Sequence, residues 1–118
     1  MKYMLLVYLD EQAMTDAERE HCYIESAQFA QDLNSSRQYL DASPLHPVAM
    51  ATSVRVREGK PVVTDGPFAE TREQLGGFFL IEATDADEAT RIAGRIPSAR
   101  MGTIEVRPMV EQAVAKPA

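Results

Sequence analysis

Apolar residues occupy both alternating sets of positions in the first predicted strand, residues 2–9. One set is Tyr3, Leu5, Val7 and Leu9, and the other is Met4, Leu6 and Tyr8. A strand that is apolar on both faces is normally covered on both faces. In a one-domain protein, helices can cover one face. The other face then needs a partner, and a second subunit is the simplest candidate. We therefore expect a homodimer that pairs through this sheet.

Two segments have the apolar spacing of amphipathic helices. The first begins near Thr15, where Thr15-Asp16-Ala17-Glu18 has capping-box form, and runs to about Leu33. Its apolar stripe comprises Cys22, Ser26, Phe29 and Leu33, flanked by Tyr23, Ala27 and Ala30. The second opens at Asp85, and its stripe comprises Ala89, Ile92, Ala93 and Ile96. We expect both stripes to face a sheet.

The rest of the pattern predicts further strands and one hairpin. The strands are expected over residues 37–42, 48–57, 61–64, 75–83 and 103–109, with a hairpin turn at Glu58-Gly59-Lys60. Gly76-Gly77 lies inside a strand and predicts a bulge or a close backbone approach. This order fits an α+β, ferredoxin-like core with an inserted β-hairpin. We expect one domain over residues 1–110 and a tail over residues 111–118.

Composition limits the partners. The 118 residues suit one domain, and the formal net charge of −6 argues against DNA or RNA, which require a clustered basic face. With Cys22 as the one cysteine, no internal disulfide can form, which fits a reducing compartment. The apolar start is too short for a membrane span and lacks a small-residue cleavage site. We expect a cytoplasmic protein that binds neither nucleic acid nor membrane.

The sequence carries no metal motif and no glycine-rich phosphate loop, so we expect neither a metal nor a cofactor. Candidate chemistry begins with His46, which lies in a loop between Leu45 and Pro47. A positioned imidazole can act as an acid or a base near neutral pH. The alternative is an ordinary exposed loop histidine.

Asp65-Gly66-Pro67 is a strongly constrained turn. Glycine takes backbone angles closed to other residues, and proline fixes its own φ. Asp65 could act as a base or orient His46, or it could accept backbone N–H groups within its own turn. We expect the two side chains to meet at one pocket, because the strands leading from both loops are expected in one sheet. The lining is expected to include Phe68, Phe78 or Phe79.

Charged residues supply the remaining candidates. Arg55 and Arg57 share one strand face and could bind an anionic substrate, or simply form an exposed hairpin face. Glu70 opens a charged segment that could close a pocket rim or form a dimer contact, although such runs are usually solvated. His21 is expected to pair with Glu25 on the helix surface.

The stretch DGPFAETREQLGGFFLIE, residues 65–82, resembles the signature of DGPF proteins, a branch of the YCII-related superfamily. The resemblance continues through residues 51–57 and 102–108. It implies a ferredoxin-like α+β protein that pairs into a dimeric α+β barrel. Many relatives carry a helix-one histidine proposed to pair with an aspartate, but that family position falls nearer Ser26 than His21. The dyad is therefore not carried over.

Two classes of function follow. The first is a small-molecule enzyme or binder, with proton-transfer chemistry of the isomerase or lyase kind suggested by analogy with related barrels. The second is a non-enzymatic regulatory or interaction protein. The resemblance implies it, because DGPF relatives are often encoded beside, or fused to, extracytoplasmic-function sigma factors. The sequence does not identify a substrate.

Overall fold

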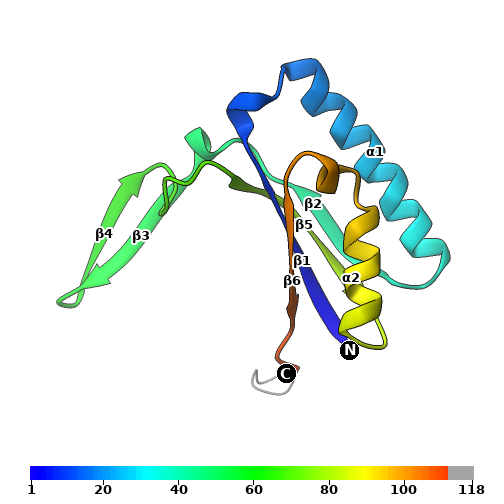
Figure 1. The fold of residues 1–118 in the computed structure, drawn as a ribbon. Coiled ribbons are helices and arrows are strands. Elements are labelled where there is room, and N and C mark those ends of the chain that lie inside the picture. The colour runs from blue at the N-terminus through cyan, green and yellow to red at the C-terminus, as the bar shows by residue number, and fades with distance from the viewer. Residues whose placement is uncertain (112–118) are drawn as a thin grey trace.

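The protein has an α+β fold built on a four-stranded antiparallel sheet, in a computed structural model that describes residues 1–111 (Figure 1). The strand order is β2-β5-β1-β6. The bounds are β1 Lys2–Leu9, β2 Tyr39–Pro44, β5 Gln74–Glu82 and β6 Thr103–Pro108. The two α-helices of the described part, α1 Asp16–Ser35 and α2 Ala86–Arg95, lie on one face of the sheet. This order and these connections match the predicted ferredoxin-like core.

The predicted hairpin is inserted between β2 and β5 and forms its own two-stranded sheet. Its strands are β3 Thr52–Arg57 and β4 Lys60–Asp65. Figure 1 shows the hairpin projecting away from the body, and we call residues 52–65 the arm. The arm makes the chain extended: its radius of gyration is 16.1 Å, whereas a compact domain of this length has about 13 Å.

The core lies between the helices and one face of the sheet. Leu5 faces Phe79 across the β1–β5 ladder, and Tyr3 faces Ile81. The helices add Phe29 and Leu33 from α1, and Ala89, Ile92, Ala93 and Ile96 from α2 and its C-cap. The predicted stripe of the second helix is therefore confirmed in full.

The other face of the sheet is apolar at its centre, and no helix of the described residues covers it. We call it the open face, and it comprises Met4, Leu6 and Tyr8 of β1 with Phe78 and Leu80 of β5. Met4 pairs with Leu80, and Leu6 pairs with Phe78. All five side chains are half-buried. As expected, helices cover one face of the first strand (Figure 1).

The two glycines of β5 have the two roles predicted for them. The register shifts from Val7 opposite Gly77 to Tyr8 opposite Leu75, so Gly76 is the extra residue of a bulge. Gly77 lies close to β2: a Cβ atom there would be 2.9 Å from the backbone oxygen of Ser43. A larger residue at Gly77 would disturb the contact between β5 and β2.

The start of α1 is a complete capping box. Thr15 Oγ1 accepts from the Glu18 N–H at 3.1 Å, and the Glu18 carboxylate accepts from the Thr15 N–H at 3.0 Å. Two hydrogen bonds with Thr15 lower the pKa of Glu18 below its ordinary value. The bond with the Thr15 backbone has the larger effect, and the bond with its side chain has the smaller one. Because the pKa of Glu18 is lower in the folded state than in the unfolded state, its ionised carboxylate stabilises the fold at any pH above the unfolded-state pKa. That contribution is lost as the pH falls through the folded-state pKa.

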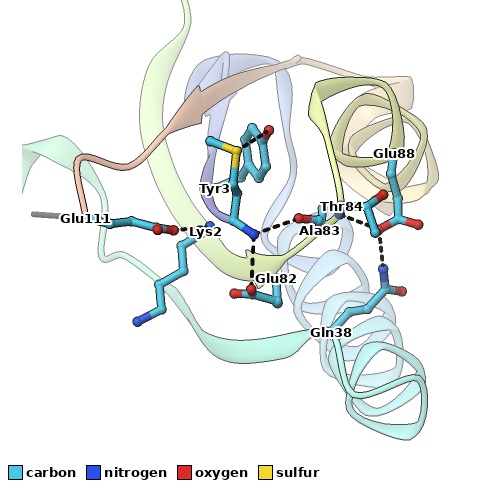
Figure 2. Close-up of polar contacts among 9 residues, drawn as sticks. Lys2, Tyr3, Gln38, Glu82, Ala83, Thr84, Glu88 and Glu111 are labelled. Atoms are coloured by element: carbon cyan, nitrogen blue, oxygen red, sulfur yellow. Dashed lines mark hydrogen bonds and ion pairs between the residues drawn. The ribbon is translucent and has the colours of Figure 1, made fainter.

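The start of α2 is tied to the end of α1. Asp85 caps the helix by accepting from the Glu88 N–H at 2.9 Å. The Glu88 carboxylate accepts from the Thr84 N–H at 3.0 Å and from Gln38 Nε2 at 3.2 Å, as Figure 2 shows. The Met1 ammonium lies 3.1 Å from the carboxylate of Glu82, a residue labelled in Figure 2. These bonds fix the ends of β1, β5 and both helices together.

Two predicted strand boundaries are wrong. Arg37 adopts a left-handed φ of 63°, and the Gln38 N–H bonds to Leu33 O at 2.9 Å. This reversal ends α1, so β2 begins at Tyr39 rather than at residue 37. Residues 48–50 form a 3₁₀ turn instead of a strand, and β3 begins at Thr52. Of the predicted tail, residues 112–118 lie outside the described residues.

The Asp-Gly-Pro turn closes the base of the arm. Gly66 has a φ of +95°, its N–H donates to Ala51 O at 2.7 Å, and its own oxygen accepts from Ser53 Oγ at 2.7 Å. Gly66→Ala should therefore destabilise the arm by about 1 kcal/mol through backbone strain. A loss of about 1 kcal/mol raises the population of the opened arm roughly fivefold, so hydrogen exchange of the arm amides should accelerate by the same factor.

Gly94→Ala is the matched control for this substitution. A Cβ atom at Gly94, in α2, would also meet nothing within 4 Å, but Gly94 has no positive φ. Alanine there should stabilise the helix by roughly 0.5–1 kcal/mol. Unchanged exchange of the arm amides in Gly66→Ala would show that the turn tolerates a side chain.

Candidate functional site

Two cavities are candidates for a ligand site, and each has a volume of about 360 Å³. The first, the helix cavity, lies between α1 and the β2–β5 side of the sheet. Its lining comprises Val7, Leu9, Tyr23, Ser26, Ala27, Ala30, Tyr39, Ala42, Ser43, Pro44, Gly76, Gly77, Phe78, Phe79 and Ser98. The second, the arm-base cavity, is lined by Leu45, His46, Pro47, Val48, Met50, Ala51, Pro67, Gln74 and Leu75.

The helix cavity results from small residues on both of its walls. On α1, Cys22, Phe29 and Leu33 of the predicted stripe are buried. Ser26, Ala27 and Ala30 line the cavity, and Ala30 also packs against the core. The sheet wall includes Gly76 and Gly77, which carry no side chain. Small residues therefore form part of both walls of the helix cavity.

The polar groups of the helix cavity are hydroxyls. Ser98 is buried and lies 3.5 Å from the Cys22 sulfur, and Ser43 donates to Pro44 O at 2.9 Å. Tyr23, Ser26 and Tyr39 make no side-chain hydrogen bond to other residues within residues 1–111, so their hydroxyls can serve a ligand. None of the lining residues carries a charge at neutral pH. The cavity therefore suits a neutral molecule with an apolar body and one or two polar groups.

His46 lies in the arm-base cavity, whose other lining side chains are apolar except for Gln74. Asp65 does not belong to that lining, although Ala51 and Pro67, near it in the structure, do. The strands that adjoin the two loops pair in two separate sheets, β2 with β5 and β3 with β4. His46 follows β2 of the main sheet, whereas Asp65 ends β4 of the separate arm. The pairing of these two residues stays a prediction.

The other predicted site residues are dispersed. Phe78 is among the residues that line the helix cavity, although its side chain lies on the open face of the sheet. The Arg55 guanidinium carbon, on the arm, lies 4.7 Å from the centre of the Phe68 ring, but Phe68 is 75% exposed, and neither residue lines either cavity. Glu70 is exposed and lines neither cavity. The structure therefore does not gather these residues into one site.

The expected surface pairing of His21 is confirmed. His21 Nε2 lies 3.1 Å from Glu25 Oε1, and Arg100 lies 2.9 Å from the other carboxylate oxygen. Cys22 is a buried residue, as expected. Within residues 1–111, no three His, Cys, Asp or Glu residues gather as they would around a metal ion. The helices of that part are each too short or too polar to cross a bilayer.

Sequence reasoning missed the principal residues of the helix cavity. Ser26, Tyr23 and Ala27 were assigned to a packed stripe, and Tyr39 was given no role. One signal was available: a serine in the middle of an otherwise apolar stripe. Ser26 lies in the middle of that stripe and lines the cavity.

Comparison with known proteins gives two matches. The model of the YCII-related domain matches residues 1–113. A protein of Rhizobium meliloti (strain 1021), named Uncharacterized protein R00369, is 38% identical over 118 residues, covering 92% of each chain.

Proposed function

The chain belongs to the YCII-related family, and from that premise we propose that it binds a small, neutral, largely apolar molecule in the helix cavity. The observation that carries this proposal is the uncharged lining of the cavity, with the hydroxyls of Tyr23, Ser26 and Tyr39 available to a ligand. Its volume of about 360 Å³ falls within the range of about 300–1,000 Å³ usual for ligand sites.

The chemistry of the lining narrows the class of ligand. Apolar side chains and the Phe79 ring favour an aromatic or alicyclic body. A carboxylate or an ammonium group would lose its hydration without a charged partner in the cavity. A hydroxyl or carbonyl group would find hydrogen-bond partners in the serine and tyrosine hydroxyls. Phenols and small cyclic ketones are therefore the first molecules to test.

A screen of neutral phenols and cyclic ketones by thermal shift and NMR should find ligands that contact α1. At a ligand concentration about tenfold above Kd, the free energy of unfolding should rise by about 1.4 kcal/mol. The perturbed resonances should belong to Ser26, Ala27 and the Gly76-Gly77 bulge. Ala27→Phe, which places a ring at the cavity wall, should weaken binding by roughly tenfold or more.

Gln28→Phe is the matched control, since Gln28 is the exposed neighbour of Ala27 and does not line the cavity. It should leave affinity unchanged. Ligands that perturb residues 45–51 and not α1 would contradict the proposal. Such ligands would indicate that the site is the arm-base cavity, where His46 could act as the predicted acid or base.

We also propose that the open face is covered by a second copy of the chain. Its centre is a continuous group of five half-buried apolar and aromatic side chains, and no helix of the described residues lies over it. Water against such a surface is unfavourable by roughly 25 cal/mol for each Å² of apolar area. Pairing of two open faces removes that surface and completes the predicted dimeric barrel.

A further inference from the structure

The arm has one apolar face and one basic face. In an antiparallel hairpin, residues directly opposite each other share a face. Val54 pairs with Val63 and Val56 pairs with Pro61, which makes one face apolar. Arg55 pairs with Val62 and Arg57 with Lys60, which places all three basic residues on the other face. The division holds along nearly the whole length of the arm.

The apolar face of the arm has no partner within residues 1–111. Val54, Val56 and Val63 are each 61% exposed. Eight of the fourteen large apolar side chains that are exposed in this part of the chain lie between residues 45 and 75. An isolated two-stranded hairpin is marginally stable in water, and concentrated apolar exposure is typical of a protein interface.

The charge of the arm is opposite to that of the remaining chain. Arg55, Arg57 and Lys60 against Glu58 and Asp65 give the arm a formal net charge of +1, which leaves −7 for the rest of the molecule. The acidic residues include Asp16, Glu18 and Glu20 at the exposed start of α1. A second copy therefore offers the arm an acidic partner, and opposite charges favour that encounter.

The length of the arm allows it to reach across a neighbouring molecule. Each strand has six residues, which corresponds to about 20 Å. The arm points away from its own body, so its apolar face cannot pack on the sheet from which it comes (Figure 1). In a symmetric dimer each arm can pack against the other subunit, and the two arm contacts are equivalent.

We propose that the arm is an intersubunit clasp: the face formed by Val54, Val56, Pro61 and Val63 packs on a second copy of this chain. The long side chains of Arg55, Arg57 and Lys60 flank that contact and meet acidic groups of the second copy. The inference does not depend on a ligand in the helix cavity. The proposed contact involves the arm and not the open face. Substitutions on the arm and on the open face therefore test the two surfaces separately.

The test compares two adjacent valines on opposite faces of β4. Val63→Lys places a charge on the apolar face, and Val62→Lys adds the same charge to the basic face. Sedimentation equilibrium over about a hundredfold range of concentration gives the association constant. Val63→Lys should weaken association by roughly tenfold or more, and Val62→Lys should change it by less than about threefold. Circular dichroism checks that both variants are folded.

A second measurement detects the contact directly. In a sample that mixes isotope-labelled and unlabelled wild-type copies, filtered NOE spectra should show contacts from the methyl groups of Val54 and Val63 to the unlabelled copy. A monomeric wild type, or a Val63→Lys variant that associates as tightly as wild type, would overturn the proposal. The apolar face would then belong to a different partner. Equal weakening of association by Val63→Lys and Val62→Lys would also overturn the proposal. The loss would then come from the added charge alone and not from its position on the apolar face.

Discussion

Replacing Gly102 with alanine is expected to lower the free energy of unfolding by about 3 kcal/mol, because the added methyl group would overlap the neighbouring strand. The new Cβ atom would collide with the backbone oxygen of Tyr8 and lie 2.8 Å from Leu9 Cδ2. The residue after Gly102, Thr103, pairs with Tyr8, so the collision forces β6 away from β1. Urea denaturation measures the loss, and the melting temperature should fall by on the order of 10 °C.

Gly76→Ala is the control for this substitution, since it also places a methyl group beside the end of β1. Its Cβ atom would meet Leu9 Cδ1 at 3.6 Å, which is an ordinary contact distance. The stability of that variant should change by less than about 1 kcal/mol. Equal stability of the two variants would show that the β1–β6 ladder opens freely at this end.

The second large effect is expected from Leu5→Ala. Leu5 is fully buried between the sheet and the helices, and truncation of such a leucine leaves a cavity that costs about 3 kcal/mol or more. Leu6 is the next residue of β1 and points to the open face, where it is half-buried. For the isolated subunit, Leu6→Ala should cost less than half as much. Urea denaturation of both variants measures the difference.

The same pair of variants tests whether the open face is covered. If a second copy lies on it, Leu6→Ala weakens the dimer, and the stability of wild type and variant depends on protein concentration. The cost of Leu6→Ala should then grow as the concentration rises, whereas the cost of Leu5→Ala should stay nearly constant. A cost of Leu6→Ala that is independent of concentration would contradict dimerisation through the open face.

Local signals in the sequence predicted much of the fold. The Thr15–Glu18 capping box, the stripe of the second helix and the hairpin turn at Glu58-Gly59 each depend on residues within a few positions of one another. The Gly76-Gly77 bulge was predictable because glycine inside a strand usually has a local reason. The strand boundaries at residues 37 and 48 were wrong, because a left-handed Arg37 and a 3₁₀ turn have no strong sequence signature.

The candidate site was harder to predict, because it depends on spaces between elements far apart in the chain. Ser26 and Ala30 fit an apolar stripe, and only the three-dimensional arrangement of α1 and the sheet shows that they line a cavity. The expected meeting of His46 and Asp65 relied on a shared sheet, but the hairpin forms its own sheet. Pattern along a strand predicts its two faces; it does not predict which larger sheet the strand joins.

The position of the arm in the chain makes it a removable module. It is inserted between β2 and β5, which are hydrogen-bonded neighbours in the main sheet, with Pro44 opposite Gly77. Because these strands are antiparallel, a tight turn of a few residues could join them directly. The ferredoxin-like sheet takes no strand from residues 45–73. Loss or exchange of that segment during evolution could thus alter how subunits assemble while the helix cavity keeps most of its walls.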